Sequence, residues 1–234
     1  MSTDMQAGTL VNQPSLSIPK EMRIAIIDDH AIVREGLERL IHHEMELAIC
    51  GLFEGSQDVL ESVTMFQPDM VIVEIALNGI NGIGLIKSIR TQFPQMPILV
   101  LSLQEECFYA ERSLRAGASG YVMKRETPHH LVWAISSVLK GNLYLSQKMS
   151  ALVLTKYLNG RTKDAGSPQT SLSNRELEIF ELIGQGHRTR TIAESLHLSI
   201  KTVETHRAHI MEKLNLRNSI ELLQRAMQWT ELRE

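Results

Sequence analysis

Five short apolar segments alternate with five amphipathic segments between Met22 and Tyr144, and this alternation limits the folds open to the chain. Near-continuous apolar strands joined by helices are typical of a parallel sheet that is covered on both faces. Right-handed crossovers then give a doubly wound α/β fold with five parallel strands. We predict strands at 23–27, 47–53, 70–75, 98–101 and 120–123, and helices at 31–43, 56–66, 82–93, 105–116 and 128–140.

Polar side chains stand where the predicted strands end. The first strand leads into Asp28 and Asp29, the third ends at Glu74, the fourth at Ser102 and the fifth at Lys124. Because the carboxyl ends of parallel strands meet at one edge, where such sheets bind ligands, this edge collects three carboxylates, a hydroxyl and an amine. A site of this composition is typical of one that binds a divalent cation and takes a phosphoryl group on its central carboxylate.

The last 65 residues or so have the pattern of a four-helix domain. Ser173 and Glu176 form a capping box at a helix start, and the stripe Leu177, Phe180, Ile183 predicts its buried face. Further helices are predicted at 189–196, 200–214 and 219–232. A three-residue turn joins the second helix to the third, which is the helix-turn-helix arrangement.

The third of these helices has one apolar face and one polar face. Val203, Ile210 and Leu214 cluster on one side at helical spacing, and His206 lies at its edge, where we expect a packed histidine with satisfied hydrogen bonds. Short polar and charged side chains on the other side suit a helix that lies in a DNA major groove. This second face carries Lys201, Glu204, Thr205, Ala208, His209 and Glu212.

Roles in DNA binding follow from the chemistry of each side chain. Glu can accept from cytosine, Thr can contact either partner of a base pair, and Ala can touch a thymine methyl group. Basic and hydroxyl side chains suit phosphate contacts, which set register and salt-dependent affinity. We predict base contacts by Glu204, Thr205 and Ala208, and phosphate contacts by Lys201, Thr202, Arg207, Lys213, Arg188 and Arg190, the last two at the start of the preceding helix.

These motifs resemble known families. The segment SLSNRELEIFELIGQGHRTRTIAESLHLSIKTVETHRAHIMEKLNL is similar to the LuxR-type DNA-binding domain, through L-S-x-R-E-x-E, I-A-x-x-L, S-x-K-T-V-x-x-H and I-x-x-K-L. The first half resembles a response-regulator receiver, through I-D-D-H, the strands that end at Glu74 and Ser102, A-G-A-S-G-Y, and Lys124. Together they resemble a NarL/FixJ-class two-component response regulator.

The resemblance implies a division of the chain and roles for its residues. It implies a flexible tail at 1–20, a receiver at 21–145, a helical connector and linker at 146–170, and a DNA-binding domain at 171–234. Asp28 and Asp29 would hold Mg²⁺ together with the third carboxylate. Ser102, Tyr121 and Lys124 would form the switch. In this class the receiver accepts phosphate from a histidine kinase and controls dimerisation and promoter binding.

The chain departs from the family at the phosphate acceptor, where Glu74 replaces aspartate. Glutamate adds one carbon, so its carboxylate reaches about 1.5 Å further, whereas attack on a phosphoryl donor needs close alignment. Three readings stay open: Glu74 imitates the phosphorylated state, the receiver is an inert dimerisation or docking module, or Glu74 is phosphorylated slowly. We expect a receiver that works without phosphorylation, which makes a partner kinase doubtful. The neighbouring Leu77-Asn78 and the run 188–191 also differ from the usual family residues.

Other classes of function fit less well. A phosphohydrolase could use the same carboxylates, but no second acid–base group follows Asp28 in a D-x-D spacing, and a helix-turn-helix domain is attached. We therefore predict a DNA-binding regulator and not an enzyme. An adaptor that has lost DNA binding would not need the intact polar helix face. Two half-sites call for a homodimer, with candidate surfaces at Leu131, Ile135 and Val138 or at Leu222, Ala226 and Trp229.

Composition is consistent with this interpretation. The net charge is −3, while His187–Arg217 carries six basic residues against three Glu. The two cysteines, Cys50 and Cys107, have neither metal nor disulfide spacing, which is typical of a reduced compartment. No apolar run approaches a membrane span, and no secretory signal is recognisable. We expect a cytoplasmic protein that binds double-stranded DNA and no membrane.

Overall fold

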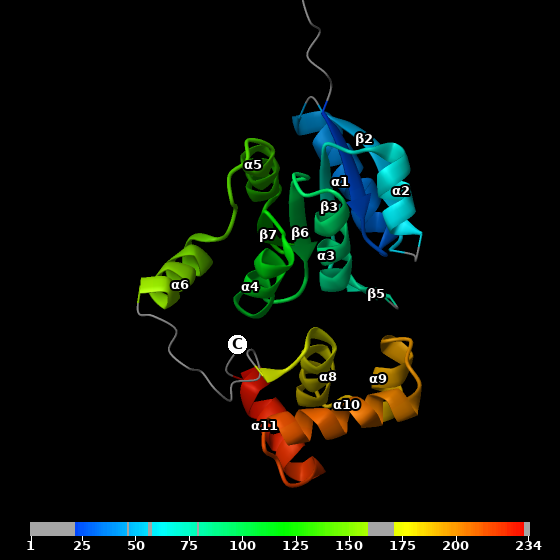
Figure 1. Ribbon diagram of the computed structural model, residues 1–234, viewed down its shortest axis with the longest axis vertical. Helices are drawn as coiled ribbons and strands as arrows, with labels where there is room; N and C mark the ends of the chain where they lie inside the picture. The colour runs from blue at the N-terminus through cyan, green and yellow to red at the C-terminus, as the bar shows by residue number, and fades with distance from the viewer. Residues whose placement is uncertain (1–21, 46, 56–57, 79, 159–170, 232–234) are drawn as a thin grey trace, which may run out of the picture.

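The computed structural model describes residues 22–45, 47–55, 58–78, 80–158 and 171–231. The tail predicted at 1–20 and most of the linker predicted within 146–170 lie outside these residues. Figure 1 shows an α/β half above a helical half. Within the described residues, no helix is both long and apolar enough to span a membrane.

The α/β half is built on one parallel sheet of five strands. The strand order is β2-β1-β3-β6-β7, and each neighbouring pair is parallel. This order confirms the doubly wound fold. The chain runs from β1 to β2 at one edge of the sheet, and then returns past β1 to add β3, β6 and β7 towards the other edge. The strands are β1 (Arg23–Ile27), β2 (Ala48–Phe53), β3 (Met70–Val73), β6 (Ile98–Ser102) and β7 (Gly120–Met123).

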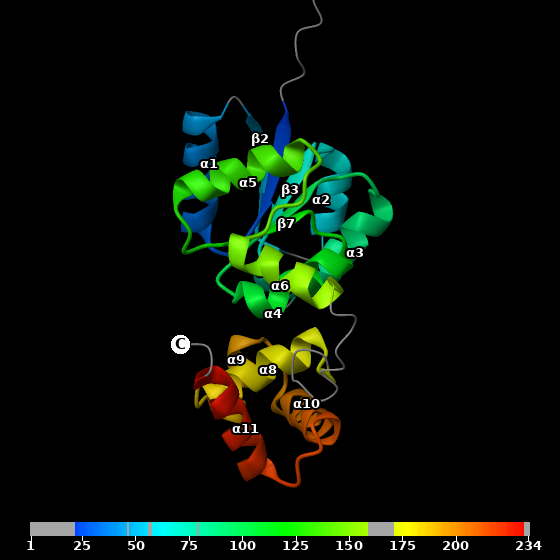
Figure 2. The same cartoon turned by 90° about the vertical axis from the view of Figure 1, so that its left-hand side faces the viewer.

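Helices cover both faces of the sheet, which explains why the strands are apolar without interruption. Ile24 and Ile26 pack towards α1 and α5, whereas Ala25 and Ile27 pack towards the opposite face. Figure 2 shows α1 to the left of the sheet and α2 and α3 to its right, with α5 passing in front. The helices are α1 (Ala31–Glu44) and α5 (Pro128–Leu139) on one face, and α2 (Val59–Phe66), α3 (Gly82–Gln92) and α4 (Glu106–Ala116) on the other.

The loop after Glu74 contains two Asn-Gly pairs, Asn78-Gly79 and Asn81-Gly82. It contains a short antiparallel hairpin of β4 (Ala76–Leu77) and β5 (Ile80–Asn81). The side chain of Asn81 accepts a hydrogen bond from the Gly84 N–H at 3.0 Å and caps α3. The second Asn-Gly pair is therefore a helix start and not a turn, since Asn is a preferred N-cap residue.

The helical half confirms the predicted helix-turn-helix domain. After the connector α6 (Gln147–Leu158), the domain consists of α8 (Asn174–Gly184), α9 (Thr189–Ser195), α10 (Ile200–Lys213) and α11 (Ser219–Glu231). The capping box is present: the Ser173 N–H donates to Glu176 Oε2 at 2.7 Å, and the Ser173 hydroxyl accepts from the Glu176 N–H. The stripe of Leu177, Phe180 and Ile183 is buried, as predicted.

The two halves meet where α4 faces α8 and α11. The ring of Phe108 packs on that of Trp229, with centroids 4.6 Å apart. Arg112 donates to Asn174 Oδ1 at 2.7 Å and to the Leu172 carbonyl at 2.8 Å. The helix that follows β6, and hence Ser102, is thus also the helix that holds the DNA-binding half.

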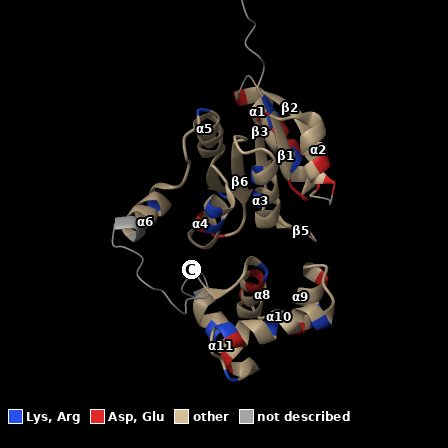
Figure 3. Cartoon of the chain, viewed as in Figure 1, with Lys and Arg blue, Asp and Glu red and all other residues tan. Residues whose placement is uncertain are grey.

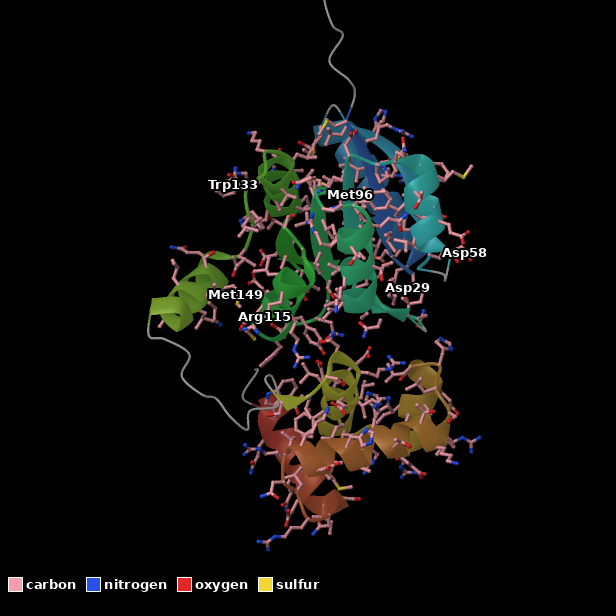
Figure 4. The ribbon with its side chains drawn as sticks, viewed as in Figure 1. Asp29, Asp58, Met96, Arg115, Trp133 and Met149 are labelled. Carbon is pink, nitrogen blue, oxygen red and sulfur yellow. The ribbon has the colours of Figure 1, made fainter. Side chains whose placement is uncertain are left out.

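The dimer surfaces suggested by the sequence are wrong at the level of residues, because their side chains form cores. On α5 the exposed aromatic is Trp133, which is 68% exposed and projects outwards in Figure 4. On α11 the outward apolar residues are Ile220, Leu223 and Met227. A surface helix turns its main apolar stripe towards the core of its own domain, so apolar residues at helical spacing pack in that core. The residues found buried are Leu131, Ile135 and Val138 of α5 and Leu222, Ala226 and Trp229 of α11.

We predict that Gly184→Ala destabilises the DNA-binding half by about 1–3 kcal/mol, the usual range for overpacking. A Cβ at this position would overlap the Ala226 carbonyl and the Thr230 hydroxyl of α11. Gly36→Ala is the control, because nothing lies within 4 Å of its Cβ, and alanine favours a helix by up to about 1 kcal/mol. Urea unfolding followed by circular dichroism measures both; equal stability of the two variants would contradict the close packing.

Candidate functional site

Glu74 ends the central strand and is 3% exposed. Its Oε1 accepts hydrogen bonds from the N–H groups of Ile75 at 2.6 Å and Ala76 at 2.9 Å, and from the Ser102 hydroxyl. Its Oε2 lies 2.9 Å from Lys124 Nζ. Both oxygens of this buried carboxylate are therefore held by donors, which is the condition for a buried charge to be tolerated.

Lys124 is shared between two carboxylates. Its Nζ lies 2.6 Å from Asp28 Oδ2 as well as 2.9 Å from Glu74 Oε2, and all three side chains are buried. Burial by itself would lower the pKa of Lys124, but the charges and hydrogen bonds of Glu74 and Asp28 outweigh it and raise the pKa. The ammonium stays charged at neutral pH and neutralises part of the carboxylate charge.

Ser102 and Tyr121 connect this charge cluster to the loop before α4. Besides donating to Glu74, the Ser102 hydroxyl accepts from the Gln104 N–H at 3.1 Å. The Tyr121 hydroxyl donates to the Gln104 carbonyl at 2.7 Å, and the ring is 1% exposed, so it points inwards. Burial raises the pKa of Tyr121 well above its ordinary value, so it remains a donor.

The residues that could hold a cation are Asp28, Asp29 and His30, whose ligand atoms lie within 4.8 Å of one another. Asp29 Oδ1 is buried and accepts no hydrogen bond within the described part of the chain, although His30 Nδ1 lies 2.8 Å from it. Figure 4 places Asp29 at the end of the sheet that faces the helical half. The acidic pair fits a divalent cation, whereas the expected third ligand, Glu74, is held by Lys124.

The predicted DNA-facing side of α10 lies at the surface, as expected. Its opposite side is packed, since Val203 and Ile210 are fully buried. Figure 3 shows basic residues, coloured blue, and acidic residues, coloured red, along α10 and α11. The receiver half contacts α8 and α11 and leaves this side of α10 open. The exposed residues are Lys201, Glu204, Thr205, Ala208, His209 and Glu212.

Some predicted DNA contacts have partners within the protein. Lys213 Nζ lies 2.6 Å from Glu176 Oε2 in the capping box, so its position has a structural explanation. Arg190 pairs with Glu194 at 3.3 Å on the surface of α9. The Thr205 hydroxyl donates to the Lys201 carbonyl at 3.0 Å and keeps its acceptor capacity. The Thr202 hydroxyl lies 2.8 Å from the hydroxyl of Ser199, the N-cap residue of α10, so its position also has a structural explanation. Arg188 is exposed and Arg207 is half-buried.

His206 is half-buried, as predicted, but the expectation that its hydrogen bonds are satisfied is wrong. Its Nδ1 is buried and has no hydrogen-bond partner among the described residues. Burial lowers the pKa of His206, while Glu176 opposes this shift. The helical spacing predicted that the ring is packed. It could not predict where the hydrogen-bonding groups of the neighbouring helix lie.

Three features of the site were not found from the sequence. The backbone N–H groups after Glu74 carry no residue signal, because every non-proline residue has one. His30 adjoins the acidic pair directly and could have been included by its position alone. The contacts of Phe108 and Arg112 with the other half depend on domain docking, although an aromatic and a basic residue on one side of a short helix were a usable signal.

Comparisons with known proteins agree with both halves. Residues 24–136 match the response regulator receiver domain, and residues 170–226 match the luxR family of bacterial regulatory proteins. The oxygen regulatory protein NreC of Staphylococcus carnosus (strain TM300) is 35% identical over 210 residues, which is 88% of this chain and 97% of that protein.

Solved structures extend the comparison to DNA complexes. RcsB from Salmonella enterica serovar Typhimurium, bound to promoter rprA in the presence of phosphomimetic BeF3-, has 26% identity and a TM-score of 0.58, and the match covers 88% of this chain and 98% of that one. A structure of two RcsB dimers bound to two parallel DNAs has 27% identity and a TM-score of 0.53, over 88% and 97% of the chains.

We predict that Glu176→Gln lowers the stability of the helical half at neutral pH by about 1–3 kcal/mol, the worth of a hydrogen bond to a charged group. Burial would raise the pKa of Glu176, but Lys213 and Ser173 outweigh it and lower the pKa. A carboxylate with a lowered pKa stabilises the fold above its unfolded pKa, and loses this effect as the pH falls through the folded value. The difference between wild type and variant should therefore shrink below about pH 4.5.

Urea unfolding at a series of pH values checks this prediction. Glu212→Gln is the matched control, because Glu212 is exposed on α10. A Glu176→Gln deficit that stays constant from pH 7 to pH 3 would contradict the charged capping interaction.

Proposed function

This chain belongs to the LuxR-family response regulators and is a DNA-binding transcriptional regulator, and we propose that Glu74 keeps its receiver in the DNA-binding state without phosphorylation. The observation that carries the proposal is the set of donors around Glu74. By family resemblance, Ser102 and Lys124 would bind the phosphoryl group of an activated receiver. Here both already bind the Glu74 carboxylate, together with the N–H groups of Ile75 and Ala76.

The position of the switch residues supports the same proposal. Tyr121 is turned inwards and bonded to Gln104, as expected for an occupied site. The exposed side of α10 is uncovered, since the receiver contacts the helical half through α8 and α11. A receiver that blocked DNA would have to cover this surface. A carboxylate whose oxygens are both held is also a poor nucleophile towards a phosphoryl donor.

Magnesium has a smaller role in this proposal than in a phosphorylated receiver. Receiver domains of this family commonly use Mg²⁺. In this chain Asp28 and Asp29 would hold it, and its charge would reduce the repulsion between the carboxylates of the cluster. We propose no catalytic activity, no need for a histidine kinase, and a cytoplasmic place of action, since the partner is DNA.

We propose that the protein binds double-stranded DNA as a homodimer, which RcsB also does in the complex with two dimers. The division into 1–20, 21–145, 146–170 and 171–234 remains our proposal for the extent of the domains. The α10 surface would lie in the major groove. Base contacts would come from Glu204, Thr205 and Ala208, and phosphate contacts from Lys201, Thr202, Arg207, Arg188, Arg190 and Lys213. To reach a phosphate, Lys213 would have to give up its ion pair with Glu176.

Variants of Glu74 test the receiver proposal. We expect Glu74→Gln to weaken dimerisation and binding to selected DNA fragments at least tenfold, because glutamine keeps the length but loses the charge that Lys124 holds. We expect Glu74→Asp with Mg²⁺ and a small phosphodonor to take up phosphate, whereas wild type does not. Sedimentation, DNA titration and phosphate uptake measure these effects, with Glu38→Gln, an exposed residue of α1, as control.

Each alternative has its own outcome in this experiment. Phosphate uptake by wild type as readily as by Glu74→Asp would support slow phosphorylation of Glu74 instead. Unchanged dimerisation and DNA affinity of Glu74→Gln would support an inert docking receiver. Either result contradicts the proposal.

Variants of α10 test the DNA contacts. We expect Lys201→Ala to weaken binding on all sequences and to reduce the slope of log affinity against log salt by about 0.9, the value for one phosphate contact. We expect Glu204→Ala to cost about 1–3 kcal/mol on preferred fragments only. Salt-titrated binding measures both, with Lys140→Ala, exposed at the end of α5, as control. An unchanged slope for Lys201→Ala would count against a phosphate contact there.

A further inference from the structure

We propose that the DNA-binding half holds a transition-metal cation such as Zn²⁺ between α8 and α10, on Glu176, His206 and His209. One ligand atom of each residue lies within 4.8 Å of the others. Two imidazoles and one carboxylate suit Zn²⁺, Ni²⁺ or Cu²⁺, whereas Mg²⁺ prefers oxygen ligands alone. This cluster is separate from the acidic pair of the receiver.

The carboxylate of Glu176 is held in place through one of its two oxygens. The Ser173 N–H at 2.7 Å and the Lys213 ammonium at 2.6 Å both bind Oε2. Oε1 faces His209, whose Nδ1 lies 3.9 Å away, beyond hydrogen-bond distance. The side chain is 4% exposed and held by the capping box, so this oxygen is positioned before any ligand arrives.

His206 supplies a buried nitrogen that lacks a partner. Its Nδ1 has no hydrogen bond among the residues that the structure describes. A ring nitrogen without a hydrogen-bond partner can offer its lone pair to a metal, which binds the neutral imidazole. His209 follows three residues later on α10, and residues at this spacing share one side of a helix.

Only a small movement is needed to close the site. Ligands about 2.0–2.2 Å from a tetrahedral zinc lie roughly 3.3 Å from one another. The His209 side chain is 53% exposed and can rotate towards Oε1, leaving a fourth position for water. Lys213 and Arg175 are the cations nearby that oppose the metal, since both act on His206 electrostatically. Lys213 remains able to hold Oε2 or to turn into solvent, because it is 41% exposed.

A bound cation would join the capping carboxylate of α8 to the helix that faces DNA. Because it binds the folded domain and not the unfolded chain, it would raise the unfolding temperature by an amount that grows with the logarithm of the free metal concentration above Kd. The effect depends on the helical half alone and does not require that Glu74 act as proposed above.

The test uses full-length protein with Zn²⁺ or Co²⁺ as probe, measured by calorimetric titration and thermal unfolding. We expect wild type to bind the metal and to unfold at a higher temperature in its presence. Any shift that Mg²⁺ causes through the acidic pair of the receiver should be the same in wild type and in the His206 and His209 variants. We expect His209→Gln and His206→Gln to bind at least tenfold more weakly and to lose the shift. His209 is exposed, so its variant should fold normally, as circular dichroism will check.

Two further variants give the controls. His187→Gln removes an exposed histidine of the same half, and His30→Gln removes the histidine beside the acidic pair of the receiver. His187→Gln should bind Zn²⁺ and show the temperature shift as wild type does. His30→Gln changes the acidic pair of the receiver but should keep the binding and the shift that depend on His206 and His209. The proposal is overturned if wild type fails to bind, if His209→Gln binds as tightly as wild type, or if His30→Gln abolishes binding.

Discussion

The buried ion-pair cluster of Asp28, Lys124 and Glu74 sets the arrangement of the receiver half. Two carboxylates at the ends of adjacent strands would repel each other in a site with little solvent, and the ammonium of a third strand holds both, at 2.6 and 2.9 Å. Removing one partner of a buried pair commonly costs about 3–5 kcal/mol, because a charge is left uncompensated. The strand order places these three ends together, so the sheet and the cluster depend on each other.

The cluster reaches the DNA-binding half through one loop and one helix. The Ser102 hydroxyl accepts a hydrogen bond from the Gln104 N–H, and the Tyr121 hydroxyl donates one to the Gln104 carbonyl. Gln104 stands just before α4, whose Phe108 packs on Trp229 of α11. In our proposal, an anion at position 74 acts through these contacts on α4, the helix that contacts the other half, while the exposed side of α10 stays uncovered. This continuity gives the carboxylate a physical route to the output of the molecule.

The sequence predicted the parts of this arrangement that depend on periodicity and strand ends. The five strands, the capping box at Ser173 and the polar side of α10 follow from local pattern, and all were confirmed. What could not be predicted depends on contacts between distant elements. Lys213 pairs with the Glu176 carboxylate on α8. His206 Nδ1 has no hydrogen-bond partner among the described residues. Asn81 caps α3 because the chain before it forms a hairpin. Helical angle places a side chain on a face, but it does not say what lies opposite.

The length of the side chain at position 74 explains why phosphorylation is dispensable in our proposal. An aspartate would end about 1.5 Å short, so Ser102 would lack this anion and Lys124 would keep only Asp28 until a phosphoryl group was attached. Glutamate reaches both donors directly. Glutamate carries one negative charge, whereas a phosphoryl group carries about −1.5 to −2. The ammonium of Lys124, which Glu74 shares with Asp28, therefore neutralises a larger part of the negative charge in this site. In our proposal the cation that a phosphorylated receiver needs is then less necessary.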